Sequence, residues 1–174
     1  MRTKDKIFGT VIMLLMLVAD QLTKYWAIIR LKGQEPIKLW QDVLHFVYAE
    51  NRGAAFSMLQ NKRIFLIIFT AVSIALVLWV IYSNKLKFNK AAYIGLCLIG
   101  SGGVGNLIDR IFRAFVVDFI YFVPINFPVF NVADICVTCG TIIFVIGFIV
   151  EELCAVRSAK LSAKNAASEE DAVE

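Results

Sequence analysis

Four stretches of this chain are apolar over about the length that a helix needs to cross a bilayer, and no other feature constrains the fold as strongly. They cover residues 7–29, 64–82, 91–112 and 132–150. A hydrocarbon core about 30 Å thick requires roughly 20 consecutive, mostly apolar helical residues. The segments between the stretches are too short for a separate globular domain. The sequence therefore predicts one membrane-embedded domain over residues 1–155, an all-α membrane protein of four transmembrane helices.

Composition agrees with a membrane protein and argues against several kinds of partner. Hydrophobic residues make up 59% of the chain and charged residues 18%, whereas about a quarter of a typical soluble domain is charged. The net charge of +4 comes from basic residues near the predicted helix ends, which suit phospholipid headgroups and not nucleic acid. Cys136 and Cys139 form a CxxC pair, but no second Cys or His pair accompanies it at metal-ligand spacing. We interpret the cysteines as small packing residues and expect neither a metal nor a cofactor.

The charges at the helix ends also predict an orientation. Residues 83–90 form a short turn rich in lysine, and such turns favour the cytoplasmic side. With four spans, both termini are then cytoplasmic, although the segment on the other side, residues 30–63, is basic as well. The N-terminal residues resemble a secretory signal peptide, but no small-residue cleavage site follows them, so we expect an uncleaved first span.

Three segments are expected outside the hydrocarbon core. Residues 31–62 mix alternating apolar residues with turn formers, which predicts a small extracytoplasmic β-sheet. Residues 115–131 are very apolar for a loop and are expected to form an interfacial loop at the membrane surface. The tail at residues 156–174 is small, polar and acidic, and we expect it to be cytoplasmic and disordered.

Polar residues at membrane depth indicate where the function lies. A charged side chain costs about 2.5–3.5 kcal/mol at the centre of a span on insertion scales, so each one needs a partner or a task. In the predicted orientation all of these residues fall in the outer leaflet or in the outer connections. They are Asp20, Lys24, Asn106, Asp109, Arg110, Asp118, Asn131 and Asp134.

Helical spacing offers structural partners for some of them. Asp20 and Lys24 are four residues apart and can neutralise each other on one helix face. Asp109 and Arg110 share a face with Asn106, and their simplest interpretation is an ion pair or a hydrogen bond between packed helices. The glycines of residues 100–105 are expected to let neighbouring helices approach closely.

Asp118 and Asp134 have no such partner, because no basic residue lies within one helical turn of either. Burial raises the pKa of a carboxyl group, and contact between two carboxylates raises one of the two further. Such a pair shares one proton, so that one member takes a proton from water while the other polarises a carbonyl group and protonates the leaving amine. That is peptide-bond hydrolysis without a metal. Judged by the residues alone, two unrelated interfacial aspartates remain the alternative.

Five motifs around these residues resemble, in order and spacing, those of the lipoprotein signal peptidases (signal peptidase II). The resemblance runs over about residues 10–150 and leaves the tail uncovered. The motifs are Asp20-Gln-Leu-Thr-Lys24, Asn51-Arg-Gly-Ala-Ala-Phe56, Gly105-Asn-Leu-Ile-Asp-Arg110, Val117-Asp118-Phe119 and Phe130-Asn-Val-Ala-Asp134.

This resemblance implies an aspartyl endopeptidase of the bacterial cytoplasmic (inner) membrane that cuts diacylglyceryl-modified prolipoproteins just before the lipidated cysteine. The family's catalytic aspartates correspond to Asp118 and Asp134, near the outer surface. Its fold has four helices, a small outer sheet and an interfacial loop. We expect prolipoproteins and membrane phospholipids as partners, and a monomer. Positions that support the site or hold substrate correspond to Asp20, Lys24, Asn51, Gly103, Asn106, Arg110 and Asn131, with Asp109 interpreted as structural.

Within this resemblance, Asn51 and Arg110 are expected to hydrogen-bond the substrate backbone. Three other interpretations compete with this one, and the first, a purely structural membrane subunit, leaves the unpaired aspartates without a reason. In a serine mechanism Lys24 would act as base for Ser101, but Asp20 on the same helix face would keep Lys24 protonated. An ion-coupled carrier would show internal repeats and a site near the midplane, and the sequence shows neither. His45, the only histidine, is expected at the surface.

Overall fold

The computed structural model describes residues 3–53, 62–83 and 88–170. Within these residues the elements are α1 (Thr3–Leu31), β1 (Ile37–Trp40), β2 (Leu44–Asn51), α2 (Arg63–Tyr82), α3 (Lys90–Phe112), β3 (Val116–Phe122), the 3₁₀ turn η2 (Val123–Ile125) and α4 (Val132–Glu170). Each of the four long helices is long and apolar enough to cross a membrane. The prediction of four transmembrane helices with a small sheet is confirmed.

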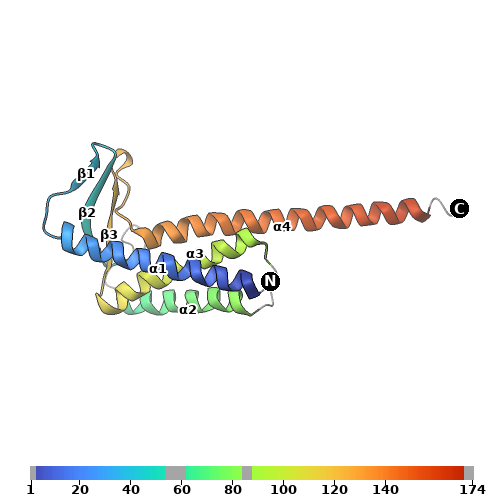
Figure 1. The fold of residues 1–174 in the computed structure, drawn as a ribbon, viewed down its shortest axis with the longest axis horizontal. Coiled ribbons are helices and arrows are strands. Elements are labelled where there is room, and N and C mark those ends of the chain that lie inside the picture. The colour runs from blue at the N-terminus through green and yellow to red at the C-terminus, as the bar shows by residue number, and fades with distance from the viewer. Residues whose placement is uncertain (1–2, 54–61, 84–87, 171–174) are drawn as a thin grey trace.

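The fourth helix differs from its prediction at its C-terminal end. α4 continues to Glu170 as one helix and extends well beyond the other three (Figure 1), whereas we expected the span to end at residue 150 and a disordered tail from residue 156. The tail is rich in Ala and Glu and also contains Lys, and these residues are among the strongest helix formers. A helix that is already nucleated inside the membrane can therefore extend through this polar segment.

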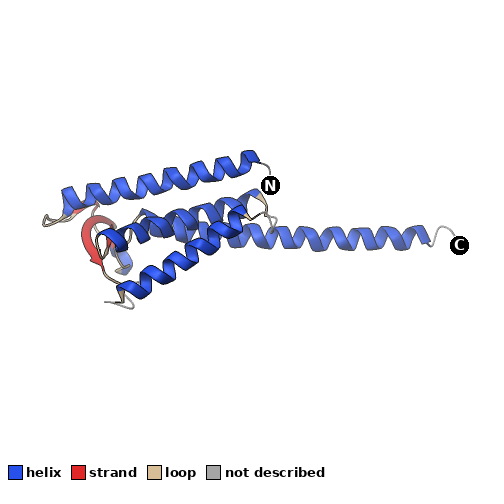
Figure 2. Cartoon of the chain, turned by 90° about the horizontal axis from the view of Figure 1, so that it is seen from below, coloured by secondary structure: helices blue, strands red, loops and turns tan. Residues whose placement is uncertain are grey.

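α3 is the helix around which the others pack. It contacts α1, α2 and α4, and the view from below shows the helices of the bundle beside one another, with one of them extending to the C-terminus (Figure 2). Glycines make the contact with α4 close, because a Cβ atom at Gly95 would lie 2.6 Å from the Gly140 carbonyl oxygen, and one at Gly140 would lie 2.7 Å from the Gly95 carbonyl oxygen. Without side chains at these positions the two backbones can touch, as is usual for membrane helices.

The small sheet sits at the end of the bundle where α1 ends and α4 begins (Figure 1). Its three described strands are antiparallel in the order β1-β2-β3. We expected the sheet within residues 31–62, but its third strand, β3, comes from the segment expected to be an interfacial loop. Val116, Val117 and Phe119 are all buried. Because both faces of β3 are covered, this strand shows no alternation of polar and apolar residues and looked like a loop of membrane-interface composition.

A small apolar core fixes the sheet to the C-terminal end of α1. Ala27 and Leu31 of α1 and Val117 and Phe119 of β3 form a buried cluster. The Trp26 ring packs edge-on against the rings of Phe46 and Phe119. This core holds β3, and therefore Asp118, in a constant position relative to the helices.

Candidate active site

Asp118 on β3 and Asp134 on the first turn of α4 are both held by one residue, Asn131. The Asn131 side-chain amide donates a hydrogen bond to Asp118 Oδ1 at 2.6 Å. The Asn131 backbone N–H donates to Asp134 Oδ2 at 3.1 Å. Asn131 has no exposed surface, and Asp118 is 2% exposed. Two acidic side chains that are sixteen residues apart in the chain therefore meet in one buried place.

The start of α4 explains why Asp134 points toward Asn131. Asn131 precedes the helix, and its side-chain Oδ1 accepts the backbone N–H of Asp134 at 3.0 Å. Asparagine is a preferred residue at this capping position. The Asp134 carboxylate in turn accepts the Asn131 backbone N–H, which makes the reciprocal pair known as a capping box. Local helix chemistry thus orients one of the two carboxyl groups.

Two further asparagines complete the hydrogen bonding of the pair. Asn51, at the end of β2, donates to Asp118 Oδ2 at 3.1 Å. Asn106, on α3, donates to Asp134 Oδ1 at 2.8 Å. Each of the four carboxylate oxygens therefore accepts a hydrogen bond from a neutral N–H donor. Neutral donors orient the two groups without the strong preference for the ionised form that a direct cation would impose.

The electrostatic setting of Asp118 suits it to hold a proton. Burial raises the pKa of Asp118 to about 7, and the nearby Asp134 raises it as well, while the hydrogen bonds from Asn51 and Asn131 oppose the shift. An isolated aspartate has a pKa of about 3.9. Asp118 therefore keeps its proton up to about neutral pH.

A buried cation network lies behind the pair. The Lys24 ammonium donates to Asp20 Oδ2 at 3.0 Å, to Asp109 Oδ2 at 3.0 Å and to Asn106 Oδ1 at 2.9 Å. Its contact with Asn106 fixes which end of that amide faces Asp134, because the oxygen is occupied by Lys24. The predicted pair Asp20–Lys24 is confirmed.

Of the two interpretations offered for Asp109 and Arg110, the ion pair with each other does not form. Asp109 pairs with Lys24 on α1 and with Arg113, one turn further along the chain and just past the end of α3. Residues four apart lie on one helix face, whereas adjacent residues diverge. The Arg110 guanidinium instead donates to the Gly53 carbonyl oxygen at 2.9 Å, so it ties the loop after β2 to α3.

Asp20 also fixes the beginning of α4. Its Oδ1 accepts the backbone N–H of Ala133 at 2.9 Å, next in the chain to Asp134. A Cβ atom at Gly105 would collide with the Asp20 carboxylate, so glycine leaves the space that this contact needs. Asp20 thereby joins α1, α3 and α4 at the depth of the site.

Asn51 and Gly103 are the remaining candidate residues, and the structure places them differently: Asn51 contacts an aspartate, whereas Gly103 faces α2. The Asn51 side-chain oxygen accepts the Gly53 N–H at 2.9 Å, which connects the loop after β2 to the site, while residues 54–56 of the same motif lie outside the described residues. Gly103 is not among the contacts of the aspartates: a Cβ atom there would meet the side chain of Ile74 on α2. The expected role of Gly103 at the site is therefore at most indirect.

The surroundings of Ser101 and His45 bear on a serine mechanism and on a metal site. Ser101 is buried, and its hydroxyl has no hydrogen-bond partner among the described residues, Lys24 included. That geometry gives no support to a serine–lysine mechanism. His45 lies on β2 opposite Tyr121 on β3. In the part of the chain that the structure describes, no group of three or more His, Cys, Asp or Glu side chains is arranged to hold a metal ion.

Sequence reasoning missed two members of the network. Arg113 pairs with Asp109, and the Gln21 amide donates to Asp20 Oδ2 at 3.0 Å. The spacing of four residues between Asp109 and Arg113 was a visible signal for the first. Gln21 lies inside the motif that begins at Asp20, but nothing in its residue type or spacing predicts that it bonds to the Asp20 carboxylate.

Comparison with known proteins gives a consistent result. The family model for signal peptidase (SPase) II matches residues 12–150. A lipoprotein signal peptidase of Clostridium tetani is 46% identical over 145 residues, which cover 82% of this chain and 92% of that protein. One from Clostridioides difficile is 42% identical over 132 residues, or 75% of this chain and 87% of that protein.

Solved structures show the same fold. A bacterial membrane enzyme determined by the in meso method at 2.3 Å resolution matches with a TM-score of 0.75 and 27% identity, over 83% of this chain and 89% of that chain. A second, at 1.9 Å resolution, matches with a TM-score of 0.72 and 28% identity, over 81% of this chain and 92% of that chain. The family match covers most of this chain and the relatives align over nearly their whole length. The chain belongs to the signal peptidase II family of aspartic peptidases.

Proposed function

We propose that Asp118 and Asp134 are the catalytic groups with which this chain, as a signal peptidase II, removes signal peptides from prolipoproteins. The observation that carries the proposal is that one buried residue, Asn131, hydrogen-bonds both carboxyl groups. Two carboxyl groups held this closely in a desolvated place share one proton at working pH. Such a pair supplies an acid and a base for the same reaction.

In the proposed mechanism Asp118 starts protonated and Asp134 starts ionised. Asp134 takes a proton from a water molecule, whose oxygen attacks the scissile carbonyl carbon, while Asp118 passes its proton to the carbonyl oxygen. The tetrahedral intermediate then collapses and the C–N bond breaks. One proton goes to the leaving amine, and the pair returns to its form with one shared proton. Positioned acid–base groups of this kind contribute about 10²–10⁴-fold each to a rate.

The substrate is proposed to be a prolipoprotein with a diacylglyceryl group on its cysteine, cut just before that residue. The family resemblance implies this, and the depth of the site agrees, because β3 and the start of α4 lie at one end of the bundle (Figure 1). Ile125 and Phe127, in the segment after β3, are exposed apolar side chains that could contact the acyl chains. Asn51 and Arg110 are proposed to hydrogen-bond the substrate backbone, since both border the loop after β2.

The chain is a multi-pass protein of a bacterial membrane, and we propose the cytoplasmic membrane with both termini in the cytoplasm. The aspartates then lie near the outer surface. We also propose that the chain acts as a monomer.

Cleavage of a defined substrate tests this function. The purified enzyme is incubated in detergent with a lipid-modified prolipoprotein or, separately, with the same prolipoprotein lacking the lipid. The masses of the products are measured by mass spectrometry. We expect release of the signal peptide from the modified form only, with the lipidated cysteine at the new N-terminus. We also expect chelators and serine-reactive reagents to leave the rate unchanged. Cleavage elsewhere, or of both forms equally, would contradict the proposed specificity.

A further inference from the structure

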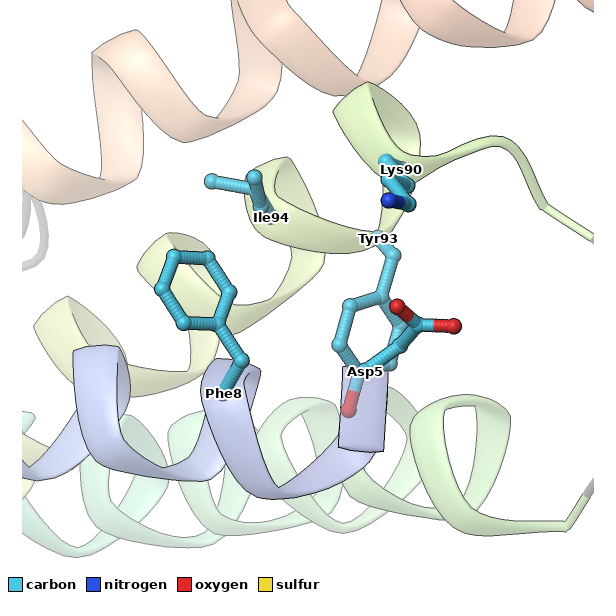
Figure 3. Close-up of a pocket in the computed structure, with 5 residues that line it drawn as sticks. All are labelled: Asp5, Phe8, Lys90, Tyr93 and Ile94. Carbon is cyan, nitrogen blue, oxygen red and sulfur yellow. The ribbon is translucent and has the colours of Figure 1, made fainter. Parts of the chain in front are cut away.

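A cavity of about 280 Å³ lies at the end of the bundle opposite the aspartates. It is lined by Asp5 and Phe8 of α1 and by Lys90, Tyr93 and Ile94 of α3 (Figure 3). α1 begins at Thr3 and α3 at Lys90, so the cavity sits at the membrane rim where both helices start. None of its lining residues belongs to the site around Asp118 and Asp134.

Both walls of this cavity change from charged to apolar within one helical turn. On α1, Phe8 follows Asp5 by three residues, and on α3, Ile94 follows Lys90 by four. At 1.5 Å per residue, these steps carry the apolar side chains about 4.5–6 Å further along the helix axes. The two helices run in the same direction (Figure 1). The opposite charges therefore lie at the rim, and Phe8 and Ile94 lie toward the bilayer centre.

Contacts within the bundle fix the position of Tyr93, which lines the cavity. The Tyr93 ring is buried, and it lies so close to Gly9 that a Cβ atom at that position would collide with it. Its hydroxyl donates to the Lys6 carbonyl oxygen at 3.5 Å. Phe8, in contrast, is 59% exposed, so the apolar wall is open to the lipid and not covered by described protein.

We propose that this cavity binds a phospholipid whose headgroup carries both a phosphate and a primary amine. The Lys90 ammonium contacts the phosphate, the Asp5 carboxylate accepts a hydrogen bond from the amine, and the first acyl carbons lie on Phe8 and Ile94. A glycerol headgroup carries no positively charged donor, and a choline headgroup is positively charged but has no N–H to donate to a carboxylate. This site is independent of the catalytic proposal, because it lies at the other end of the molecule.

Native mass spectrometry tests the proposal. The full-length protein is exposed to equimolar phosphatidylethanolamine, phosphatidylglycerol and phosphatidylcholine with identical acyl chains, and the bound fraction of each is measured. We expect phosphatidylethanolamine to be retained about fivefold over the other two, the size of effect that one charge-assisted hydrogen bond at an exposed rim can supply. Equal retention of the three lipids would overturn the proposal, since it would reflect only the general lipid shell.

Matched variants assign the preference to the cavity. Asp5→Asn should bind the three lipids about equally, whereas Lys90→Gln should reduce the binding of all of them. Lys4→Gln removes a charge from the same rim outside the lining residues and should keep the wild-type pattern. If a charge variant loses its fold, Ile94→Ala replaces it and should also reduce the binding of all three. Unchanged lipid preference in Asp5→Asn, or a loss in Lys4→Gln equal to that in Lys90→Gln, would refute the site.

Discussion

At the scale of single residues, Asn131 does most to define the proposed active site. Its side chain bonds to Asp118 and its backbone to Asp134, and its side-chain amide also lies 3.2 Å from Asn106 Oδ1. The sequence indicated Asn131 as a polar residue one turn before Asp134, and the family resemblance implied a supporting role for it, but neither indicated that it bridges the two carboxyl groups. Its bridging role depends on the arrival of β3 beside α4, and no local pattern in the sequence encodes that meeting.

The pKa of Asp118 predicts the pH dependence of cleavage. Burial and the neighbouring Asp134 raise this pKa to about 7, so Asp118 is protonated below that pH. The one-proton form of the pair is therefore lost as pH rises through about 7. We expect kcat/KM, which reports the free enzyme, to fall on the alkaline side of that value. A profile that stays flat well into the alkaline range would contradict the assignment of Asp118 as the acid.

Lys24 is predicted to hold the buried network together. Lys24→Met keeps a side chain of similar length but leaves Asp20 and Asp109 without their shared ammonium group. Loss of one partner from a buried ion pair costs about 3–5 kcal/mol, because a charge stays buried without compensation. We expect a loss of that size in the free energy of unfolding, measured by denaturant titration in detergent. Lys32→Met, which removes an exposed pair with Glu50, is the control and should change nothing measurable; equal effects of the two would refute this role.

At the scale of elements, close packing of α3 on α4 brings Asn106 within hydrogen-bond distance of Asp134. A Cβ atom at Gly102 would overlap the Ala133 carbonyl oxygen, which is backbone and cannot move alone. Gly102→Ala should therefore push α4 away from α3 and lengthen the Asn106–Asp134 contact. We expect cleavage to fall by at least about tenfold, since small misplacements of catalytic groups cost 10²-fold in rate.

The control for this prediction lies on the same helix. A Cβ atom at Gly100 would meet Met13 Sδ at 3.3 Å and Val77 Cγ1 at 3.6 Å, and both are side-chain atoms that can shift. Gly100→Ala should keep near-normal cleavage and thermal stability. If Gly102→Ala is as active as Gly100→Ala, the α3–α4 contact does not position the site.

The elements themselves differ in how far the sequence predicts them. The four spans were predictable because bilayer thickness imposes a length and a composition. The pair Asp20–Lys24 was predictable because residues four apart lie on the same face of a helix. β3 was not, because burial on both faces removes the alternation that marks a strand, and the pairing of Lys24 with Asp109 was not, because it joins two helices. Local periodicity is readable in a sequence, whereas contacts between elements are set by the tertiary fold.

At the scale of the whole molecule, the proposed orientation predicts which segments lie on each side of the membrane. The sheet and the aspartates lie at one end of the bundle, and the N-terminus lies at the other (Figure 1). With both termini in the cytoplasm, green fluorescent protein fused to the C-terminus should fluoresce in cells and alkaline phosphatase fused there should be inactive. Asp42→Cys, in the exposed turn between β1 and β2, should react with a membrane-impermeant maleimide. The opposite pattern in both assays would invert the topology.

The central claim is that two aspartates perform the hydrolysis together, and substitution of each one tests it most directly. Turnover of a lipid-modified prolipoprotein is compared for the wild type, Asp118→Asn and Asp134→Asn, with Asp42→Asn as control. Asp42 is exposed and has a φ of 62°, a conformation that asparagine also adopts readily. We predict that the control cleaves normally, and that both site variants fold with near-normal melting temperatures yet lose at least about 10²-fold in rate. Wild-type turnover by either folded site variant would contradict the claim.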